Sequence, residues 1–435
     1  MDFSKSLEMN ERFHSSIPGG SHTYAKGDDQ YPEFALPYIV RGQGCHVWDL
    51  DGNEFIEYGM GLRSVTLGHA YKPVVDAAYN QMLRGNNFSR PASIEIECAE
   101  KLLSMIKGAE MVRFAKSGSD VNGGAIRLSR AYTGRDMIAA CGSHPFFSGD
   151  DWFIGSTPVS AGIPKSIRDL TVKFRYNDMD SVKALFQQYP DKIACVILEP
   201  EKEEEPKNNF LHELHKLCNE KGSVFILDEM ITGFRWHNGG AQRFHNIMPD
   251  LCTFGKALAN GFSVAALAGK KEIMQLGGLR HDKERVFLMS GTHSAENHGL
   301  AAAIETMKIY EREPVIDTLW GQGERLAAGL TKSIAENNLS DYIPIMGRPC
   351  CLVYGTRDNE NKPSQPFRTL LIQEIMKRGI LAASLVISYS HTDSDVDRTI
   401  EAFHEAFHIY RKALDEGIKK YLIGRPVKPV WRKFN

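Results

Sequence analysis

Several common active-site patterns are absent from this chain of 435 residues. It has no GxSxG elbow, Walker loop or GxGxxG turn, which disfavours serine hydrolases, P-loop NTPases and dinucleotide enzymes. Its eight cysteines form no CxxC pair, and only Cys350 and Cys351 are close together. Five histidines are scattered without metal-ligand spacing: His22, His69, His144, His293 and His298. The sequence therefore predicts no metal site.

Long apolar segments and an excess of one charge are also missing. No stretch of about 18 apolar residues occurs, and the first residues, MDFSKSLEMNERFH, lack the apolar run of a signal peptide. Lys plus Arg number 52 against 54 for Asp plus Glu, which gives no sign of a nucleic-acid or acidic-lipid surface. We expect a soluble cytoplasmic protein that binds neither membrane nor nucleic acid.

The middle of the chain alternates between apolar strand-like runs and helical patterns. The strand-like runs are 110–117, 136–141, 192–200, 223–229 and 264–269. The helical patterns among them are 121–132, 179–188 and 210–220. This alternation predicts an α/β fold with a mostly parallel sheet covered by helices. Ligands of such sheets bind at the carboxyl ends of the strands.

The two ends of the chain have a different pattern. Residues 45–59 alternate apolar and polar around Asp51-Gly52, which is typical of a hairpin with a type I′ turn. After about residue 300, four helical stretches alternate with the strand-like 351–355 and 379–389. We expect a large domain of residues 61–315 and a smaller α+β domain made of 1–60 with 316–435.

Asp228 and Lys256 are the residues that point most directly to chemistry. Asp228 ends the apolar run SVFILD, and Lys256 lies in the Gly-flanked turn of CTFGKALANGF. A lysine amine can form a Schiff base with the aldehyde of pyridoxal phosphate. A carboxylate can pair with the protonated pyridine nitrogen and keep the ring an electron sink. The pair therefore predicts a pyridoxal phosphate site.

Ser117, Gly118 and Ser119 lie where a strand-like run meets a helical pattern. Free backbone N–H groups and the helix dipole favour an anion there, and the hydroxyls add donors. The alternative is simple capping of the helix by Ser119, without a ligand. Beside Asp228 and Lys256, phosphate binding is the favoured interpretation.

Four further residues are weaker candidates. Phe146 can stack on a flat cofactor ring, although core packing claims most Phe residues and Phe147 competes for the role. Glu199 ends another strand-like run and can contact a ligand or a polar neighbour. Thr292, in a polar loop bounded by glycines, can donate to a phosphate or simply form a turn.

Ordered motifs along nearly the whole chain resemble those of class III, fold-type I pyridoxal phosphate-dependent aminotransferases, within the glutamate-1-semialdehyde aminomutase branch. The motifs are SIPGG, VWDLDGNEFIEYG, LGHAY, AIRLSRAYTGRD, VILEP, LDEMITGFR and MPDLCTFGKALANGF. The resemblance implies a homodimer in which Lys256 is the Schiff-base lysine and Asp228 the partner of the pyridine nitrogen. It also implies that Ser117, Gly118 and Ser119 hold the phosphate.

The resemblance implies further roles at two other positions. Thr292 matches a threonine that reaches the phosphate held by the neighbouring subunit, which would make a dimer obligatory for complete sites. Phe146 falls where the family usually has a tyrosine stacked on the ring. Glu199 lies in the shared VILEP motif.

The chain departs from the aminomutase pattern where that enzyme contacts its substrate. Lys26 stands where the aminomutase has an arginine that holds the substrate carboxylate, and lysine lacks the bidentate fork. Arg63 adjoins Leu62, which replaces a pocket tryptophan. If Lys26 and Arg63 line the pocket, they favour an anionic or polyhydroxylated carbonyl compound. We expect transfer of an amino group from L-glutamate to a keto- or aldehydo-sugar used in cell-surface glycan biosynthesis.

Two alternatives remain open from the sequence. The first is glutamate-1-semialdehyde 2,1-aminomutase activity, in which one substrate serves both half-reactions. The second is a pyridoxal phosphate-binding scaffold without turnover, against which the presence of both Lys256 and Asp228 argues. Dependence on an external amino donor separates the first alternative from the expected transfer.

Overall fold

The computed structural model describes residues 1–435, which divide into two compact units. Unit 1 comprises Met1–Tyr71 with Asp317–Asn435, and unit 2 comprises Lys72–Ile316. The expected large domain began at residue 61, whereas the structure groups residues 61–71 with unit 1. Backbone hydrogen bonds explain this grouping, because the N–H of His69 donates to the carbonyl of Gly44 and the N–H of Tyr389 to that of Thr66.

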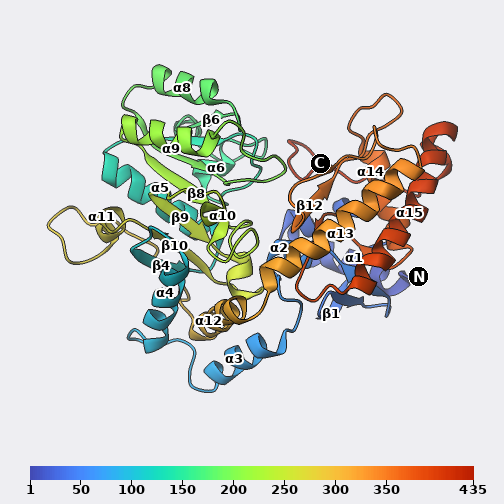
Figure 1. Ribbon diagram of the computed structural model, residues 1–435, viewed down its shortest axis with the longest axis horizontal. Helices are drawn as coiled ribbons and strands as arrows, with labels where there is room; N and C mark the ends of the chain where they lie inside the picture. Colours follow the sequence, from blue (N-terminus) through green and yellow to red (C-terminus); the bar gives the residue numbers. More distant parts are fainter. The chain divides into compact units, whose positions relative to one another are not determined.

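Unit 2 is built on a seven-stranded sheet with the strand order β4-β10-β9-β8-β7-β5-β6 (Figure 1). Only β10 runs antiparallel to its neighbours, β4 and β9. The strands are β4 (Met111–Ala115), β5 (Met137–Cys141), β6 (Thr171–Phe174), β7 (Ile193–Leu198), β8 (Val224–Asp228), β9 (Leu251–Phe254) and β10 (Ala265–Gly269). Every residue of β5, β7, β8, β9 and β10 is buried, as expected for strands covered on both faces.

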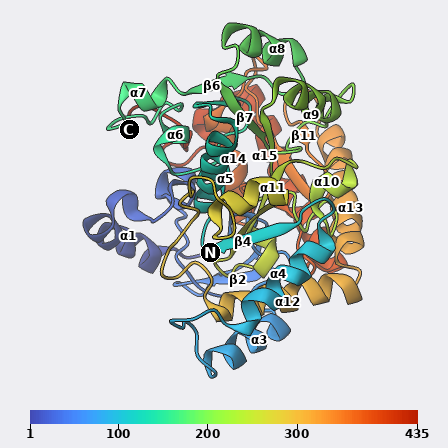
Figure 2. The same cartoon turned by 90° about the vertical axis from the view of Figure 1, so that its left-hand side faces the viewer.

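The helices of unit 2 pack on this sheet and on one another. Helix α5 (Gly118–Thr133) crosses the sheet, with contacts from β4 to β7. Helices α8 (Met179–Gln188) and α9 (Phe210–Lys221) pack together and contact β6 and β8, respectively. Helix α12 (Asn297–Arg312) lies alongside α3 (Lys72–Met82) in both views (Figures 1 and 2).

The remaining helices of unit 2 are α4 (Ser93–Met105), α6 (Asp151–Ile154), α7 (Lys165–Arg168), α10 (Gly240–Phe244) and α11 (Lys271–Met274), with the 3₁₀ turns η4 (Lys256–Ala259) and η5 (Gln275–Gly277).

The predicted α/β fold with a mostly parallel, helix-covered sheet is confirmed. The short strand β6 was not anticipated, because only two of its four residues are buried and its apolar signal is weak. No helix anywhere in the chain has both the length and the apolar character needed to span a bilayer.

Unit 1 contains two small sheets. The first has the order β1-β2-β3-β13, formed by Ile39–Gln43, His46–Asp49, Glu54–Glu57 and Ile380–Leu381. The second has the order β11-β12-β14, formed by Ile345–Met346, Cys351–Tyr354 and Leu385–Val386. Because β13 pairs in parallel with β3, the C-terminal part of the chain extends a sheet that the N-terminal part begins.

The helices of unit 1 come from both ends of the chain. They are α1 (Ser4–Ser16), α2 (Met60–Arg63), α13 (Val315–Glu336, whose first two residues fall in unit 2), α14 (Gln365–Met376) and α15 (Asp393–Glu416), with four short 3₁₀ turns at Pro18–Gly20, Tyr24–Lys26 (η2), Asp28–Gln30 and Ile418–Lys420. A shared core holds these segments together: Phe3, Ala35, Val47, Phe55, Ile372, Met376 and Leu381 pack in one buried cluster. Burial of that apolar surface explains why the two ends of the chain form one unit.

Two local predictions in unit 1 need correction. The hairpin of β2 and β3 exists, but its turn is not type I′, because Gly52 has a positive φ and Asp51 does not. The side chain of Asp49 organises the loop instead, accepting hydrogen bonds from the N–H groups of Asp51 and Asn53. The single strand predicted for 379–389 is two strands of two residues each, which pair in different sheets.

Candidate functional site

Asp228 ends β8 and is 2% exposed. Its Oδ1 accepts a hydrogen bond from the N–H of Met230 at 2.8 Å, and its Oδ2 accepts one from Asn122 Nδ2 at 2.7 Å. Burial raises the pKa of Asp228, while the charge of nearby Lys256 and these two hydrogen bonds act in the opposite direction. The carboxylate is therefore one that a further positive charge would stabilise.

Lys256 opens η4, directly after β9 and Gly255. Strands β8 and β9 are parallel neighbours in which Asp228 pairs with Thr253, so Lys256 follows shortly after the register partner of Asp228. Lys256 has a φ of 45°, a left-handed conformation that strains a residue with a Cβ. The fold therefore brings the aspartate and the lysine to one edge of the sheet, where the parallel strands end.

Asn122 connects this edge to helix α5 and was not singled out from the sequence. Its Nδ2 donates both to Asp228 Oδ2 and to the carbonyl of Phe147, each at 2.7 Å. Its Oδ1 accepts a hydrogen bond from Thr253 Oγ1 at 2.8 Å. Asn122 and Thr253 are both fully buried. The one available signal was a polar residue on the apolar face of a helix, beside Val121 and Ala125.

The three predicted phosphate-loop residues lie at the start of α5. Ser117 is the N-cap, whose Oγ accepts from the N–H of Asp120, and the Asp120 carboxylate accepts in turn from the N–H of Ser117. The capping residue is thus Ser117, not Ser119 as the alternative proposed, because Ser117 is the one with extended backbone. Ser119 Oγ accepts from the N–H of Gly149 at 2.8 Å.

Both hydroxyls at the start of α5 act as acceptors in these contacts, so the proton of each is left to donate to an anion. Gly118 lies between them, and a Cβ there would come within 3.2 Å of Met230 Sδ. Side chains larger than glycine are therefore crowded at this position. The helix start combines first-turn N–H groups, hydroxyl donors and a close backbone approach, which suits a phosphate.

The two phenylalanines differ in how the fold uses them. Phe147 is 1% exposed and packs edge-on against Phe153 and His144. Phe146 is 50% exposed and touches Phe153 with its ring centroids 5.9 Å apart. Phe146 is the more exposed of the two rings, so it stays the predicted stacking residue.

Glu199 directly follows β7 and is 4% exposed. Its backbone N–H donates to His144 Nδ1 at 3.0 Å, so that nitrogen carries no proton. Burial, and then the charge of Lys202, lowers the pKa of His144 to about 3. A neutral histidine thus fixes the backbone at the end of β7 over the physiological pH range.

Thr292 lies in the loop before α12, where its carbonyl accepts from Asn87 Nδ2. It lines a cavity of about 450 Å³ that also includes Lys116, Asp120 and Arg127. Ser117, Gly118 and Ser119 do not line this cavity, although Lys116 and Asp120 flank them in sequence. Within one chain, Thr292 therefore does not lie with Ser117, Gly118 and Ser119, which form the candidate phosphate cradle at the start of α5. Its predicted role across a dimer stays a prediction.

The two predicted substrate residues belong to unit 1. Lys26 is exposed at the end of η2. Arg63 is partly buried in α2, where Gly61, Leu62 and Arg63 have left-handed φ values. Their role as substrate contacts also stays a prediction.

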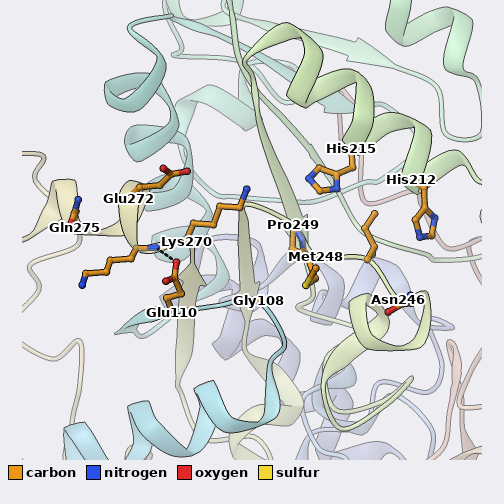
Figure 3. A pocket seen from close by; sticks show the side chains of 12 residues that line it. Gly108, Glu110, His212, His215, Asn246, Met248, Pro249, Lys270, Glu272 and Gln275 are labelled. Atoms are coloured by element: carbon orange, nitrogen blue, oxygen red, sulfur yellow. Dashed lines mark hydrogen bonds between the residues drawn. The ribbon is translucent and has the colours of Figure 1, made fainter.

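A larger cavity lies at the other edge of the sheet, where the parallel strands begin (Figure 3). It has a volume of about 780 Å³, and its lining includes His212, His215, Pro249 and Lys270. Lys270 Nζ lies 2.5 Å from Asp250 Oδ1. Neither Asp228 nor Lys256 lines this cavity, so its size alone does not make it the candidate active site.

One HExxH sequence does occur, at His404–His408 in α15, and the sequence analysis overlooked it. Both histidines and Glu405 are exposed. Glu405 accepts from Arg378 Nε at 2.5 Å, and His404 Nδ1 lies 2.7 Å from Ser333 Oγ. The glutamate and one histidine are thus engaged in surface contacts, which differs from the arrangement that a metalloprotease needs.

The residues at the carboxyl edge of the sheet fit pyridoxal phosphate. A cationic ring nitrogen would supply the charge that buried Asp228 favours, and the start of α5 would hold the phosphate. Phe146, which is half-exposed, is the more accessible of the two neighbouring phenylalanine rings. Lys256 acts electrostatically on Asp228 and supplies an amine at the same edge.

Comparisons with known proteins agree with this chemistry. The family model described as aminotransferase class-III matches residues 27–407. The glutamate-1-semialdehyde 2,1-aminomutase of Desulforamulus reducens is 31% identical over 438 residues, covering 95% of this chain and 99% of that protein. The 3-aminobutyryl-CoA aminotransferase of Cloacimonas acidaminovorans is 31% identical over 428 residues, with the same coverage of both chains.

Among solved structures, the FumI protein of Sphingopyxis sp. MTA144 in its PLP internal aldimine form superposes with a TM-score of 0.85. It is 27% identical, and the match covers 94% of this chain and 97% of that one. The similarity therefore extends over both units of the chain.

Proposed function

Because the chain belongs to the class-III aminotransferase family, we propose that it transfers an amino group from L-glutamate to a carbonyl acceptor of the keto- or aldehydo-sugar class. Family membership confirms the predicted enzyme class and the predicted cofactor, pyridoxal phosphate. Donor and acceptor are the parts of this proposal that lie beyond the family assignment.

The observation that carries the proposed chemistry is the environment of Asp228. A carboxylate buried at the end of β8, held by Met230 N–H and Asn122 and next to the charge of Lys256, is oriented and kept from water. Such a group favours a cationic partner in a fixed position. Asp228 would therefore hold a proton at the pyridine nitrogen of the cofactor.

When bound, pyridoxal phosphate supplies an aldehyde that takes up amino groups and a protonated ring that withdraws electrons from the neighbouring carbon. Lys256 is the proposed residue that anchors the aldehyde at rest. The amine of Lys256 would also be the group that holds and moves the proton between the donor α-carbon and the cofactor. Ser117 and Ser119 would bind the phosphate with hydroxyl and backbone donors, and Phe146 would set the tilt of the ring.

The acceptor class rests on two residues and on what they replace in the aminomutase pattern. Lys26 stands in place of an arginine and lacks its bidentate fork, and Arg63 beside Leu62 adds a second positive charge. An anionic or polyhydroxylated carbonyl compound suits such groups better than a small amino-aldehyde. Use of the aminated product in cell-surface glycan biosynthesis and a cytoplasmic site of action remain part of the proposal.

A homodimer completes the proposed enzyme. Thr292 lies outside the cradle at the start of its own α5, in a cavity lined by Lys116 and Arg127. Its proposed role is to donate to the phosphate bound by a second copy of the chain. A Thr292→Ala variant should then lose cofactor affinity without losing dimerisation, as measured by cofactor titration and analytical ultracentrifugation.

Glutamate-1-semialdehyde 2,1-aminomutase activity is a second candidate, favoured by the relative that carries this name. Donor dependence separates the two candidates. The purified, cofactor-loaded enzyme should aminate a panel of keto- and aldehydo-sugars only when L-glutamate is present, with 2-oxoglutarate released in equal amount. Rapid turnover of glutamate-1-semialdehyde without an external donor would instead establish the aminomutase.

A further inference from the structure

A cysteine, a histidine and an aspartate converge in unit 1, between the start of β2 and the first turn of α15. Cys45 Sγ lies 3.4 Å from Asp395 Oδ2, and His46 Nε2 lies 3.1 Å from Asp395 Oδ1. One donor atom of each residue lies within 4.8 Å of the other two. Cys45 is 1% and Asp395 6% exposed, so the cluster is largely closed to water.

His46 is held between two carboxylates. Its Nδ1 lies 2.8 Å from Glu54 Oε1, and its Nε2 faces Asp395. Nδ1 makes no hydrogen bond in this arrangement, so the hydrogen-bond contact of the ring is the one between Nε2 and Asp395 Oδ1.

The two carboxylate oxygens of Asp395 have different partners. Oδ2 completes the capping box of α15, accepting from the N–H of Thr392 at 3.0 Å and from its hydroxyl at 2.7 Å. Oδ1 has only His46 as a hydrogen-bond partner. The helix cap therefore accounts for Oδ2, which Cys45 Sγ also contacts, and leaves Oδ1 directed at His46.

We propose that Cys45 Sγ, His46 Nε2 and a carboxylate oxygen of Asp395 bind one zinc ion. The site lies wholly in unit 1, separate in sequence and in fold from Asp228 and Lys256. It does not depend on the proposed amino transfer, so either proposal can fail alone.

The donor set and its spacing both suit zinc. A thiolate and an imidazole select zinc over magnesium or calcium, which prefer oxygen ligands. Donors at about 2.0–2.3 Å from a tetrahedral zinc stand roughly 3.4–3.6 Å apart. The 3.1 Å contact of His46 ends on Oδ1 of Asp395 and the 3.4 Å contact of Cys45 ends on Oδ2, with all three donors within 4.8 Å of one another, so the carboxylate must rotate for one oxygen to meet both partners. Glu54 supplies the outer carboxylate that commonly orients a zinc-bound histidine through its second nitrogen.

A zinc ion at this position would join segments far apart in the chain. His46 and Asp395 are separated by 349 positions, and their contact links the first sheet of unit 1 to its longest helix. A metal that binds only the folded state stabilises that state by mass action. The expected role is therefore structural, because the ion would link the N-terminal and C-terminal parts of unit 1.

The experiment uses the full-length, pyridoxal phosphate-loaded enzyme, stripped with a chelator and then dialysed against limiting zinc. Wild-type protein should retain one zinc per chain by elemental analysis and should unfold at a higher temperature with zinc than without it. Cobalt in place of zinc should give a thiolate-to-metal absorption band. Cys45→Ser should lose the retained metal and the band, because a serine hydroxyl is a poor zinc ligand but can still donate to Asp395.

Two further variants sharpen the test. Cys98→Ser, at a buried cysteine of α4 in unit 2, should keep the zinc and controls for the loss of a buried thiol. Glu54→Gln should weaken zinc binding about tenfold while leaving the ligands in place. Wild-type protein that retains no zinc, zinc retained equally by Cys45→Ser, or bound cobalt without a thiolate band would each overturn the proposal in favour of a metal-free hydrogen-bond cluster.

Discussion

Two buried aspartates lie at opposite edges of the seven-stranded sheet, Asp228 where β8 ends and Asp250 directly before β9. Asp250 accepts from the N–H of Phe225 at 2.8 Å and forms an ion pair with Lys270. The other aspartate, Asp228, has an amide and a backbone N–H as donors and a lysine that acts on it electrostatically. The same residue type thus has an ion-paired lysine at one edge, and at the other edge two neutral hydrogen-bond donors and the charge of Lys256.

The difference shows why cavity size is a poor guide to this active site. At the edge with the larger cavity (Figure 3), the charge of Asp250 is already matched by Lys270. At the other edge, burial raises the pKa of Asp228 while the charge of Lys256 lowers it, so the buried carboxylate there favours a cationic ligand. That edge is also the carboxyl end of the parallel strands, where ligands of such sheets bind.

Substitution of the lysine at each edge, Lys256 or Lys270, should give the largest difference in turnover. Lys256→Ala should lower turnover by at least roughly 10⁴-fold, because it removes the group that anchors the cofactor and moves the proton. Lys270→Ala should keep wild-type turnover. Borohydride reduction of the wild-type enzyme, followed by peptide mapping, should place the cofactor on Lys256. Label on Lys270, or normal turnover of Lys256→Ala, would reverse the assignment of the edges.

Substitution of the two aspartates should likewise lower turnover at Asp228 and not at Asp250. Asp228→Asn should lower turnover roughly 10²–10⁴-fold, since a neutral amide does not hold the ring nitrogen protonated. The cofactor should remain bound, because the phosphate cradle is untouched. Asp250→Asn should lower the melting temperature through loss of its ion pair and leave turnover unchanged. Steady-state kinetics and thermal unfolding of the two variants measure this contrast, and equal losses of activity would contradict it.

The strands that end at the edge with Asp228 and Lys256 could largely be predicted from sequence, because they are short, continuous apolar runs. β7 and β8 are buried along their whole length, and the chain places Asp228 at the end of one of them. The left-handed turn at Lys256 follows a glycine that the sequence shows. The proximity of Asp228 and Lys256 therefore followed from topology, since parallel neighbours end at the same edge.

Other contacts could not be predicted, because they depend on tertiary packing between distant segments. Asn122 meets Asp228 across 106 positions, and nothing local marks it as more than a polar helix residue. Cys45 and Asp395 are 350 positions apart, so no ligand spacing reveals their cluster. Phe146 and Phe147 are adjacent and chemically identical, and only burial distinguishes them.

Asn122 offers a way to sharpen the contrast between the edges without removing the carboxylate itself. Asn122→Ala removes a hydrogen bond to a charged group, worth about 1.5–3 kcal/mol, and should lower kcat roughly 10–100-fold with little change in KM. The pH titration of the bound cofactor's visible absorbance should shift as well, because Asp228 then holds the ring proton less firmly. The absorbance shift separates positioning of Asp228 from general damage to the fold.

Ser129→Ala is the matched control for that variant. Ser129 is also a fully buried polar residue of α5, and its hydroxyl donates to the carbonyl of Ala125 within the same helix. We expect a modest loss of stability and no change in kcat or absorbance. If both variants lowered kcat equally, the effect would belong to α5 as a whole and not to the bond between Asn122 and Asp228.

The smallest expected effects distinguish capping from phosphate binding at helix starts in the two units. Ser117 caps α5, and Ser364 caps α14 by accepting from the N–H of Phe367. Replacing either by alanine should lower stability by about 1 kcal/mol. Only Ser117→Ala, together with Ser119→Ala, should also weaken pyridoxal phosphate binding in a cofactor titration, because only these two hydroxyls follow a strand at the edge of the sheet that holds Asp228. Unchanged cofactor affinity in both variants would reduce the start of α5 to an ordinary helix cap and move the phosphate site elsewhere along the same edge.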